Sequence, residues 1–337
     1  MRGRVRGGLF GAFALAVLVV GTSSCGASTS MTATPRTTGP VSAAVRARER
    51  AGDPPAPTLK AGQQATVTYC NHQQAHITEP AVLHGPTPAV IYVHGGGWVG
   101  GNLNSGGFLI STIGPALAAN GFVVVSIDYR LGPGDHWPDQ IDDVKCAVRY
   151  LRANARRLHI YPSEIGAWGE SAGGHLVALT GTTGRSDGWD VGPYAGVSSR
   201  IQAVVDMAGP SDLLTMGNQG DAVLVAEEFD RLLGNIPEHN LGADLRADSP
   251  VTYIKHGDPP FLILQSTNDT VVYPQQAEEL AWDLAVNHVP YTLVMDNGGG
   301  HEFDDPGAVP DEAQITSLVV QFFVKTLVFQ STVGLNG

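Results

Sequence analysis

A serine between glycines stands in "WGESAGG", residues 168–174, and its surroundings are those of a nucleophile. Gly169, Ser171 and Gly173 form the pattern G-x-S-x-G, with a strand-like stretch before it and a helix-like stretch after it. Such a turn holds the serine in a strained backbone conformation, and the flanking glycines relieve the crowding around it. The pattern therefore predicts that Ser171 is a nucleophile; the alternative is a serine that only caps the following helix.

A serine hydroxyl is a weak nucleophile at neutral pH, so it needs a histidine base and a carboxylate that orients this base. In strand–turn–helix sites of this kind the order along the chain is Ser, then Asp or Glu, then His. Asp269 follows the strand-like "FLILQS", and His301 follows the strand-like "YTLVMD" within a glycine loop. We therefore predict that Asp269 orients His301 and that His301 activates the serine.

Other acids and histidines compete for these two roles: Asp206, Asp212, Asp296, His256 and His288. Asp206 falls inside its predicted strand, and Asp296 stands too close to the predicted base to come from a separate strand. Both competing histidines precede a strand rather than follow one, which would place them at the wrong edge of a parallel sheet. The order of motifs therefore favours Asp269 and His301.

Five glycines crowd the stretch "VIYVHGGGWVGGN", residues 90–102, just after a strand-like run. Attack on a carbonyl group creates a negatively charged oxygen, and bare backbone N–H groups can stabilise it. We predict that the N–H groups of Gly96, Gly97 and Ala172 form this oxyanion hole, with Gly95 as an alternative donor. His94 is expected to brace the loop rather than to take part in chemistry.

A phosphate-binding loop is the other explanation for so many glycines. A Walker loop requires a lysine after its glycines, and none follows here. A dinucleotide-binding fingerprint can be forced onto "GGGWVGG", but it leaves Ser171, Asp269 and His301 without a role. We expect neither a cofactor nor a metal ion; His72 and His76 are spaced like metal ligands but have no third ligand nearby.

Strand-like and helix-like segments alternate from about residue 62 onward. Strands are expected at 65–70, 89–93, 122–128, 164–169, 201–208, 261–266 and 291–296, and helices at 138–158, from 171 onward, at 274–287 and at 311–329. This alternation predicts an α/β fold with a mostly parallel central sheet and helices on both faces. Ligand sites in such sheets lie beyond the carboxyl ends of the strands, where the candidate residues fall.

Together, "HGGGW", "GESAGGH", Asp269 and "GGGHEF" resemble the motifs of α/β-hydrolases of the bacterial esterase and lipase group. Within that group the chain is similar to small carboxylesterases related to hormone-sensitive lipase and to the family named for feruloyl esterases (BD-FAE). The resemblance covers about residues 60–330, and "VSIDYRLGP", "DSPVTYI" and "DPPFLIL" add to it. It implies a serine hydrolase that cleaves small carboxylic esters through an acyl-enzyme.

Two other functions remain open from the sequence: an amidase, arylformamidase or peptidase with the same triad, and a surface binding module without activity. The chain also departs from relatives of hormone-sensitive lipase, because little room remains for an N-terminal helical cap. Residues 210–250 could form a small lid instead. Trp98 could line a pocket or belong to the core, and Glu170 is expected to be a buried structural residue.

The N-terminus reads as a bacterial export signal. Arginines precede the apolar run at residues 9–20, and small residues follow it, which is typical of a signal at 1–25. Cys25 stands where a lipoprotein signal places its lipidated cysteine, so membrane attachment through a lipid, plain secretion and an uncleaved membrane anchor are all open. Residues 26–60 read as a flexible linker to a catalytic domain at 61–330.

The net charge argues against a nucleic-acid partner, and the cysteines leave open whether a disulfide forms. The formal net charge is −12, and no basic run follows the first residues, so nucleic-acid binding is not expected. Cys70 and Cys146 could form one disulfide in an oxidising compartment, or they could be two buried thiols. The sequence does not decide between these states, and it says nothing of the oligomeric state.

Overall fold

The computed structural model describes residues 55–219, 232 and 238–328 of the chain. The expected export signal with Cys25 and most of the expected linker lie outside these residues, as do two parts of the candidate lid, 220–231 and 233–237. Among the described residues, no helix has the length and apolar character needed to cross a membrane.

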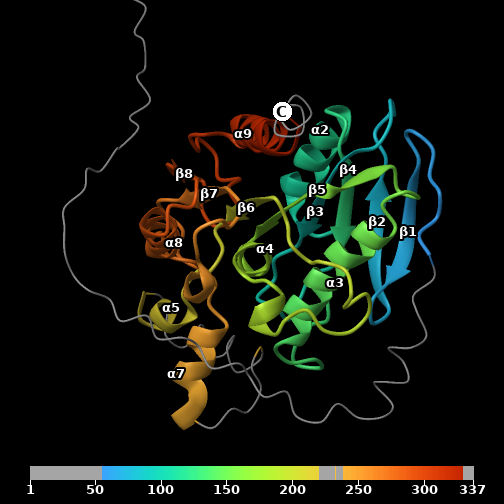
Figure 1. The fold of residues 1–337 in the computed structure, drawn as a ribbon. Helices are drawn as coiled ribbons and strands as arrows, with labels where there is room; N and C mark the ends of the chain where they lie inside the picture. The colour runs from blue at the N-terminus through green and yellow to red at the C-terminus, as the bar shows by residue number, and fades with distance from the viewer. Residues whose placement is uncertain (1–54, 220–231, 233–237, 329–337) are drawn as a thin grey trace, which may run out of the picture. The chain divides into compact units, whose positions relative to one another are not determined.

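One eight-stranded sheet forms the centre of the fold, in the order β1-β2-β4-β3-β5-β6-β7-β8. The strands are β1 (Gln64–Tyr69), β2 (Gln73–Thr78), β3 (Thr87–Val93), β4 (Val123–Ile127), β5 (Ile160–Glu170), β6 (Ala203–Met207), β7 (Phe261–Ser266) and β8 (Tyr291–Asp296). β1 and β2 pair antiparallel and β2 pairs antiparallel with β4, whereas every pair from β4 to β8 is parallel. Figure 1 shows β1 and β2 in blue at one edge and β8 in orange at the other. The predicted, mostly parallel α/β sheet is confirmed.

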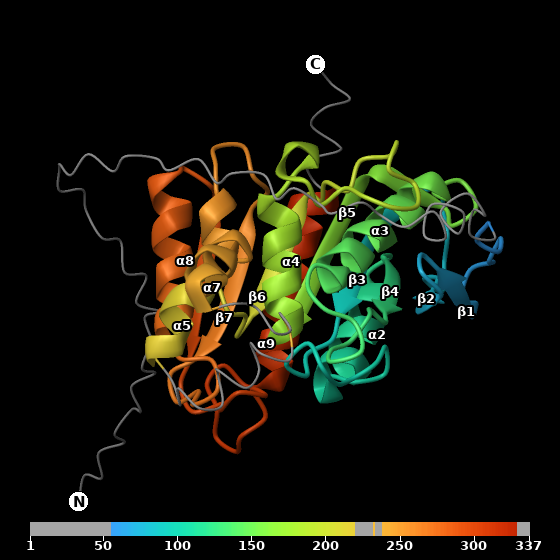
Figure 2. The ribbon, with the colours of Figure 1, turned by 90° about the horizontal axis from the view of Figure 1, so that it is seen from below.

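Helices cover both faces of this sheet. The helices are α2 (Gly114–Ala119), α3 (Asp139–Ala153), α4 (Ala172–Thr182), α5 (Leu213–Gln219), α7 (Glu238–Ala247), α8 (Gln275–Val286) and α9 (Glu312–Phe323), with π-helical turns η1 (Leu109–Ile113) and η4 (Val324–Val328) and short 3-10 turns η2 (Arg185–Asp187) and η3 (Pro250–Tyr253). Figure 2 shows α3, α4 and α8 along one side of the sheet and α2 and α9 along the other. No helix precedes β3 in the described residues, which begin at 55.

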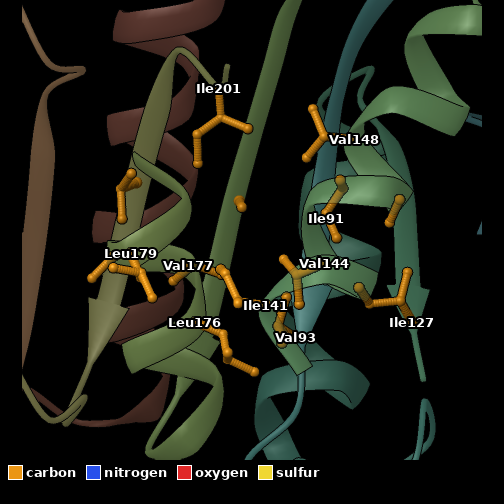
Figure 3. Packing of buried hydrophobic residues seen from close by; sticks show 14 of the residues in the cluster. Ile91, Val93, Ile127, Ile141, Val144, Val148, Leu176, Val177, Leu179 and Ile201 are labelled. Atoms are coloured by element: carbon orange, nitrogen blue, oxygen red, sulfur yellow. The ribbon is translucent and has the colours of Figure 1, made fainter. Parts of the chain in front are cut away.

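The central strand β3 explains how one sheet supports two hydrophobic layers. Successive side chains of a strand point to opposite faces, so Ile91 and Val93 join the core under α3 and α4, whereas Val90 and Tyr92 join the core under α2 and α9. Figure 3 shows the first layer, in which β3 packs beside the apolar stripe of α3 (Ile141, Val144, Val148). This two-sided burial explains why the middle strands are continuous apolar runs.

A disulfide joins Cys70, directly after β1, to Cys146 in the middle of α3. It therefore ties the antiparallel edge of the sheet to the helix layer. Arg130 holds α3 from another direction, because its Nε lies 2.8 Å from Asp143 Oδ2 and its guanidinium also pairs with Asp139. These ion pairs fix the loop after β4 to the first turns of α3.

The structure adds two elements that the sequence did not predict and corrects the ends of two predicted helices. β2 was not predicted, because only Ala75 and Ile77 of its six residues are buried. α2 was also missed, because six residues beginning with Gly114 and Pro115 carry almost no helical pattern. The helix expected at 138–158 ends at Ala153, and the helix expected at 311–329 changes to π-helix at Val324.

Candidate active site

Ser171 occupies the turn between β5 and α4, in the backbone conformation φ 54° and ψ −122°. A positive φ is unfavourable for a residue with a Cβ atom, and such strain persists only where the surroundings enforce it. Here the Ser171 N–H donates to Met207 O at 2.8 Å, and the Ser171 carbonyl accepts from His175 N at 3.0 Å. Its side chain makes no capping hydrogen bond, so the alternative of a simple helix cap is wrong.

The flanking glycines allow the turn to close. A Cβ atom on Gly169 would lie 2.5 Å from the carbonyl carbon of Gly173, and one on Gly173 would collide with the Val93 carbonyl. Real Cβ contacts are never this short, so both positions require glycine. The packing of β3 against the start of α4 therefore depends on the same glycines that define the sequence motif.

Asp269 and His301 form a hydrogen-bonded pair in the loops after β7 and β8. His301 Nδ1 lies 2.8 Å from Asp269 Oδ2. The other carboxylate oxygen accepts from the backbone N–H groups of Val271 and Val272 at 2.8 and 3.0 Å, and Gln265 Nε2 donates to Oδ2 at 3.1 Å. These donors hold the Asp269 carboxylate in one orientation, and that orientation fixes the imidazole of His301.

The electrostatic surroundings of His301 favour its charged form. Burial acts to lower the pKa of His301, but the hydrogen bond and charge of Asp269, together with Glu302 and Glu170, raise it above the usual 6.5. A raised pKa means that the site stabilises an imidazolium, which is the form a base takes after accepting a proton. The pair therefore has the properties of a general base with an orienting carboxylate.

The serine and the Asp–His pair lie at the same edge of the sheet because their strands end there. β5, β6, β7 and β8 are neighbours and run parallel, so the loops that carry these residues leave from the same end. Glu170, the residue before the serine, is near enough to His301 that the charge of His301 lowers the pKa of Glu170. The order of motifs thus predicted residues that the fold brings to one edge.

Among the residues that the structure describes, the acid hydrogen-bonded to His301 is Asp269 and none of its competitors. Asp206 is buried inside β6, where its Oδ1 accepts from Gly209 N at 2.9 Å, and Asp296 is the last residue of β8. His256 precedes β7 and His288 precedes β8. In the described part of the chain, the other carboxylate–imidazole pair is Glu79 with His159, which precedes β5 and so lies at the opposite end of the sheet.

The glycine loop after β3 lies directly against the serine turn. A Cβ atom on Gly95 would stand 2.5 Å from Glu170 Oε1 and 3.2 Å from Ser171 Cβ. Gly96 and Gly97 follow with φ values of 114° and 58°. Within the described residues, no acceptor is paired with the N–H of Gly96, Gly97 or Ala172, so these groups can donate to a bound oxygen.

His94 braces the loop, as expected. Its side chain is fully buried, its Nδ1 lies 2.7 Å from the Gly95 carbonyl oxygen, and its ring stacks on Tyr129 at 4.4 Å between centroids. The Tyr129 hydroxyl also donates to the His94 carbonyl at 3.0 Å. These contacts fix both the ring and the backbone of His94 in the core.

Glu170 is buried, as predicted, but its electrostatic role was missed. Burial raises the pKa of Glu170 to about 7, and the negative charge of Glu302 adds to the effect while His301 opposes it. A carboxyl group that titrates near neutrality beside the candidate nucleophile influences the charge of the whole site. Its position next to Ser171 in the sequence could have indicated that Glu170 affects the site. That Glu302 lies near Glu170 is evident only from the folded structure.

Trp98 belongs to the core rather than to a pocket wall. It is 1% exposed, and its indole N–H donates to His175 Nδ1 at 3.1 Å. His175 was not singled out from the sequence, although it lies only four residues after Ser171, in the first turn of α4. In the described ranges, no cluster of three or more His, Cys, Asp or Glu residues could hold a metal ion, and His76 instead contacts Thr66 Oγ1 at 3.1 Å.

The sheet order, the serine turn between β5 and α4, and the acid and histidine after the last two parallel strands, β7 and β8, define an α/β-hydrolase fold. The chain belongs to the BD-FAE family, whose model matches residues 76–284. The resemblance inferred from the motifs is therefore confirmed at the level of fold and family.

Two related proteins of Mycobacterium tuberculosis carry names that describe an activity. The esterase LipC is 32% identical over 220 residues, which are 65% of this chain and 54% of LipC. The probable carboxylic ester hydrolase LipM is 30% identical over 244 residues, which are 72% of this chain and 55% of LipM. This chain thus spans about half the length of these relatives.

Solved structures show the same fold over most of the chain. A truncated carbohydrate esterase from gut microbiota has a TM-score of 0.68 at 29% identity, with 80% of this chain and 98% of that chain covered. A thermophilic esterase from Thermogutta terrifontis has a TM-score of 0.63 at 24% identity, with 77% and 93% covered, and supports the fold alone.

Proposed function

We propose that this protein is a serine hydrolase that cleaves small carboxylic esters through an acyl-enzyme. The observation that carries the proposal is the 2.8 Å hydrogen bond between His301 and Asp269, at the sheet edge where Ser171 occupies its strained turn. A nucleophile, a base and an orienting carboxylate are the three groups that acyl transfer requires. The names of the relatives, which are esterases, favour an ester over an amide.

In the proposed mechanism, the Ser171 hydroxyl attacks the acyl carbon while His301 accepts its proton. The tetrahedral intermediate collapses, and His301 passes the proton to the departing alcohol, which leaves an acyl group on the serine. Water then attacks this ester, again with His301 as the base, and the acid is released. Asp269 keeps the imidazole in one tautomer and stabilises its charged form.

The negative oxygen of each tetrahedral intermediate would be held by backbone N–H groups. The loop against the serine turn offers Gly96 and Gly97, and the start of α4 offers Ala172. Such donors are worth about 10²–10³ in rate each in acyl transfer. The positive φ values of both loop glycines support this assignment, because they expose backbone where a side chain would be strained.

Covalent labelling tests the nucleophile directly. A fluorophosphonate probe should label wild-type protein at one site per molecule, and peptide mapping should place the label on Ser171. The S171A variant should be neither labelled nor active on p-nitrophenyl acetate, whereas S186A, in the short turn η2, should behave as wild type. Failure to label folded wild-type protein would contradict the proposal.

A substrate panel separates ester from amide hydrolysis. It should contain p-nitrophenyl esters of increasing acyl length, an acetylated sugar, a feruloyl ester and a formyl anilide. We expect the highest kcat/KM on an ester; a preference for the anilide would assign the same triad to amide chemistry instead.

We also propose that the protein is exported and attached to the membrane through a lipid on Cys25. The basic and apolar pattern of residues 1–25 supports this, and so does the disulfide, since disulfides persist mainly in oxidising compartments. A metabolically supplied palmitate analogue should label the wild-type chain in a bacterial host but not a C25S variant. Equal labelling of both would contradict the lipid anchor.

A further inference from the structure

His175 joins the helix of the serine to the glycine loop. It lies one turn beyond Ser171 in α4, where its backbone N–H donates to the Ser171 carbonyl at 3.0 Å. Its ring reaches the glycine loop, because Trp98 Nε1 donates to His175 Nδ1 at 3.1 Å. The two rings also meet edge to face, with centroids 5.3 Å apart. One residue thus contacts both structures that carry the candidate oxyanion donors.

The contacts of His175 determine which of its nitrogen atoms carries the proton. An indole N–H can only donate, so Nδ1 of His175 must accept. The proton therefore sits on Nε2, which lies 2.8 Å from the Asp248 carbonyl oxygen and donates to it. Burial keeps this ring neutral, since it lowers the pKa of His175 to about 4. Each ring nitrogen thus has one role and one partner.

The hydrogen bond from Trp98 to His175 helps to hold Trp98 in an unfavourable backbone conformation. Trp98 is a non-glycine residue with φ of 59°, and it directly follows Gly96 and Gly97, which also have positive φ. Side chains avoid this conformation unless their surroundings enforce it. Two hydrogen bonds do so here: the indole N–H donates to His175, and the Trp98 carbonyl accepts from Gly132 N at 3.0 Å.

We propose that His175 is a positioning residue that, through Trp98, fixes the N–H groups of Gly96 and Gly97 relative to the N–H of Ala172. This proposal rests on the function proposed above, because it needs an oxyanion to be bound. The donor on α4 and the donors on the loop come from segments far apart in the chain, and the His175–Trp98 hydrogen bond sets their spacing. Misplacing such donors lowers transition-state binding more than ground-state binding.

Two substitutions of His175 separate its two contacts. Asn places an oxygen near the position of Nδ1, so H175N keeps an acceptor for Trp98 and loses the contact to Asp248. Gln places its amide nitrogen near Nε2, so H175Q keeps the contact to Asp248 and loses the acceptor. W98F removes the donor from the other side. Its matched control is W168F, because Trp168 is fully buried and its indole N–H has no partner among the described residues.

The readout is kcat on p-nitrophenyl acetate per fluorophosphonate-labelled site, together with the Ki of a trifluoromethyl ketone that forms a tetrahedral adduct. We expect W98F and H175Q to lower kcat about tenfold or more with little change in KM, and to weaken the ketone in parallel. H175N and W168F should stay within about threefold of wild type. The W98F/H175Q double variant should be no worse than either single variant, because both remove one hydrogen bond.

Counting labelled sites removes unfolded molecules from the comparison, so a purely structural role would lower the labelled fraction and leave kcat per site unchanged. That outcome for W98F would overturn the positioning role. A loss in H175N that equals or exceeds the loss in H175Q would overturn it as well, because the acceptor that H175N keeps for Trp98 would then not be what sustains activity. A wild-type protein that is not labelled at all would instead contradict the proposed function.

Discussion

His301 Nδ1 lies 2.8 Å from Asp269 Oδ2, although 32 residues separate them. The register of the last two strands explains the meeting. Ser266 at the end of β7 pairs with Asp296 at the end of β8, so the two loops leave the sheet side by side. The Thr267 N–H donates to the Asp296 carbonyl at 2.8 Å and extends that alignment by one residue. A hydrogen bond between distant residues thus follows from the strand pairing beneath it.

Replacing Asp269 by Asn should remove most of the activity. Asn keeps the shape of Asp but loses the charge and can hold the imidazole in the wrong tautomer, a change that costs about 10⁴ in kcat in a serine protease triad. The measurement is kcat on p-nitrophenyl acetate per labelled site. D304N is the control, since Asp304 is an exposed acid three residues beyond His301. A loss below tenfold in D269N would remove Asp269 from the triad.

The acid limb of the pH profile should lie above pH 6.5. His301 must be neutral to accept a proton, and its pKa is raised above 6.5 because Asp269, Glu302 and Glu170 outweigh the opposing effect of burial. Activity should therefore fall as the pH decreases through this raised value. The measurement is kcat/KM from pH 5 to 9 at constant ionic strength. A midpoint at or below 6.5 would contradict the assigned electrostatics.

Removing the charge of Glu302 should move that limb to lower pH. Glu302 is one of the charges that raise the pKa of His301, and it is exposed, so the shift in E302Q should be a few tenths of a pH unit and smaller at high salt. E312Q is the matched control, because Glu312 is an equally exposed acid at the start of α9. The same shift in both variants would indicate a general charge effect rather than a local one.

Replacing Glu170 by Gln tests the acid beside the nucleophile. Its pKa of about 7 means that Glu170 is partly charged at neutral pH, and its charge raises the pKa of His301. E170Q should therefore shift the acid limb downward and make it steeper around pH 7, with the kcat plateau kept within about tenfold of wild type. An unchanged profile would show that Glu170 stays neutral throughout.

The sequence carries most of the fold because the strands have strong local patterns. β7 and β8 begin and end where they were predicted, at 261–266 and 291–296, since both are apolar runs bounded by turn residues. β2 has no such pattern: its alternation includes only Ala75 and Ile77 as buried apolar residues, and it is a strand because β1 and β4 pair with it. Pairing across the chain overrides weak local preference there.

Some residues of the candidate site could be predicted from local sequence patterns, and others could not. Ser171, Asp269 and His301 could be selected because each follows a recognisable strand and the order of the three is characteristic. The His175–Trp98 hydrogen bond joins residues 77 apart, and nothing local in either segment indicates it. The charge of Glu302 near Glu170 was hidden for the same reason. Contacts between separate loops depend on the assembled sheet, which motifs do not describe.

The Cys70–Cys146 disulfide gives the last prediction, on stability rather than catalysis. It closes a loop with a sequence separation of 76, and a bridge over a loop of that length stabilises the folded state by roughly 2–4 kcal/mol, chiefly by restricting the unfolded chain. The double variant C70A/C146A should lose about this much free energy of unfolding in urea. Its kcat per labelled site should match wild type, because the bridge joins β1 to α3 and contacts none of the proposed catalytic residues.

A reductant supplies the matched control for this measurement. Dithiothreitol should lower the urea midpoint of wild-type protein toward that of C70A/C146A and leave the double variant unchanged, since Cys25 is then the remaining cysteine of the chain. Equal midpoints for oxidised wild type and the double variant would mean that the bridge does not form or does not stabilise. A formed bridge would in turn favour an oxidising compartment for the folded domain, which links this stability measurement to the proposed export.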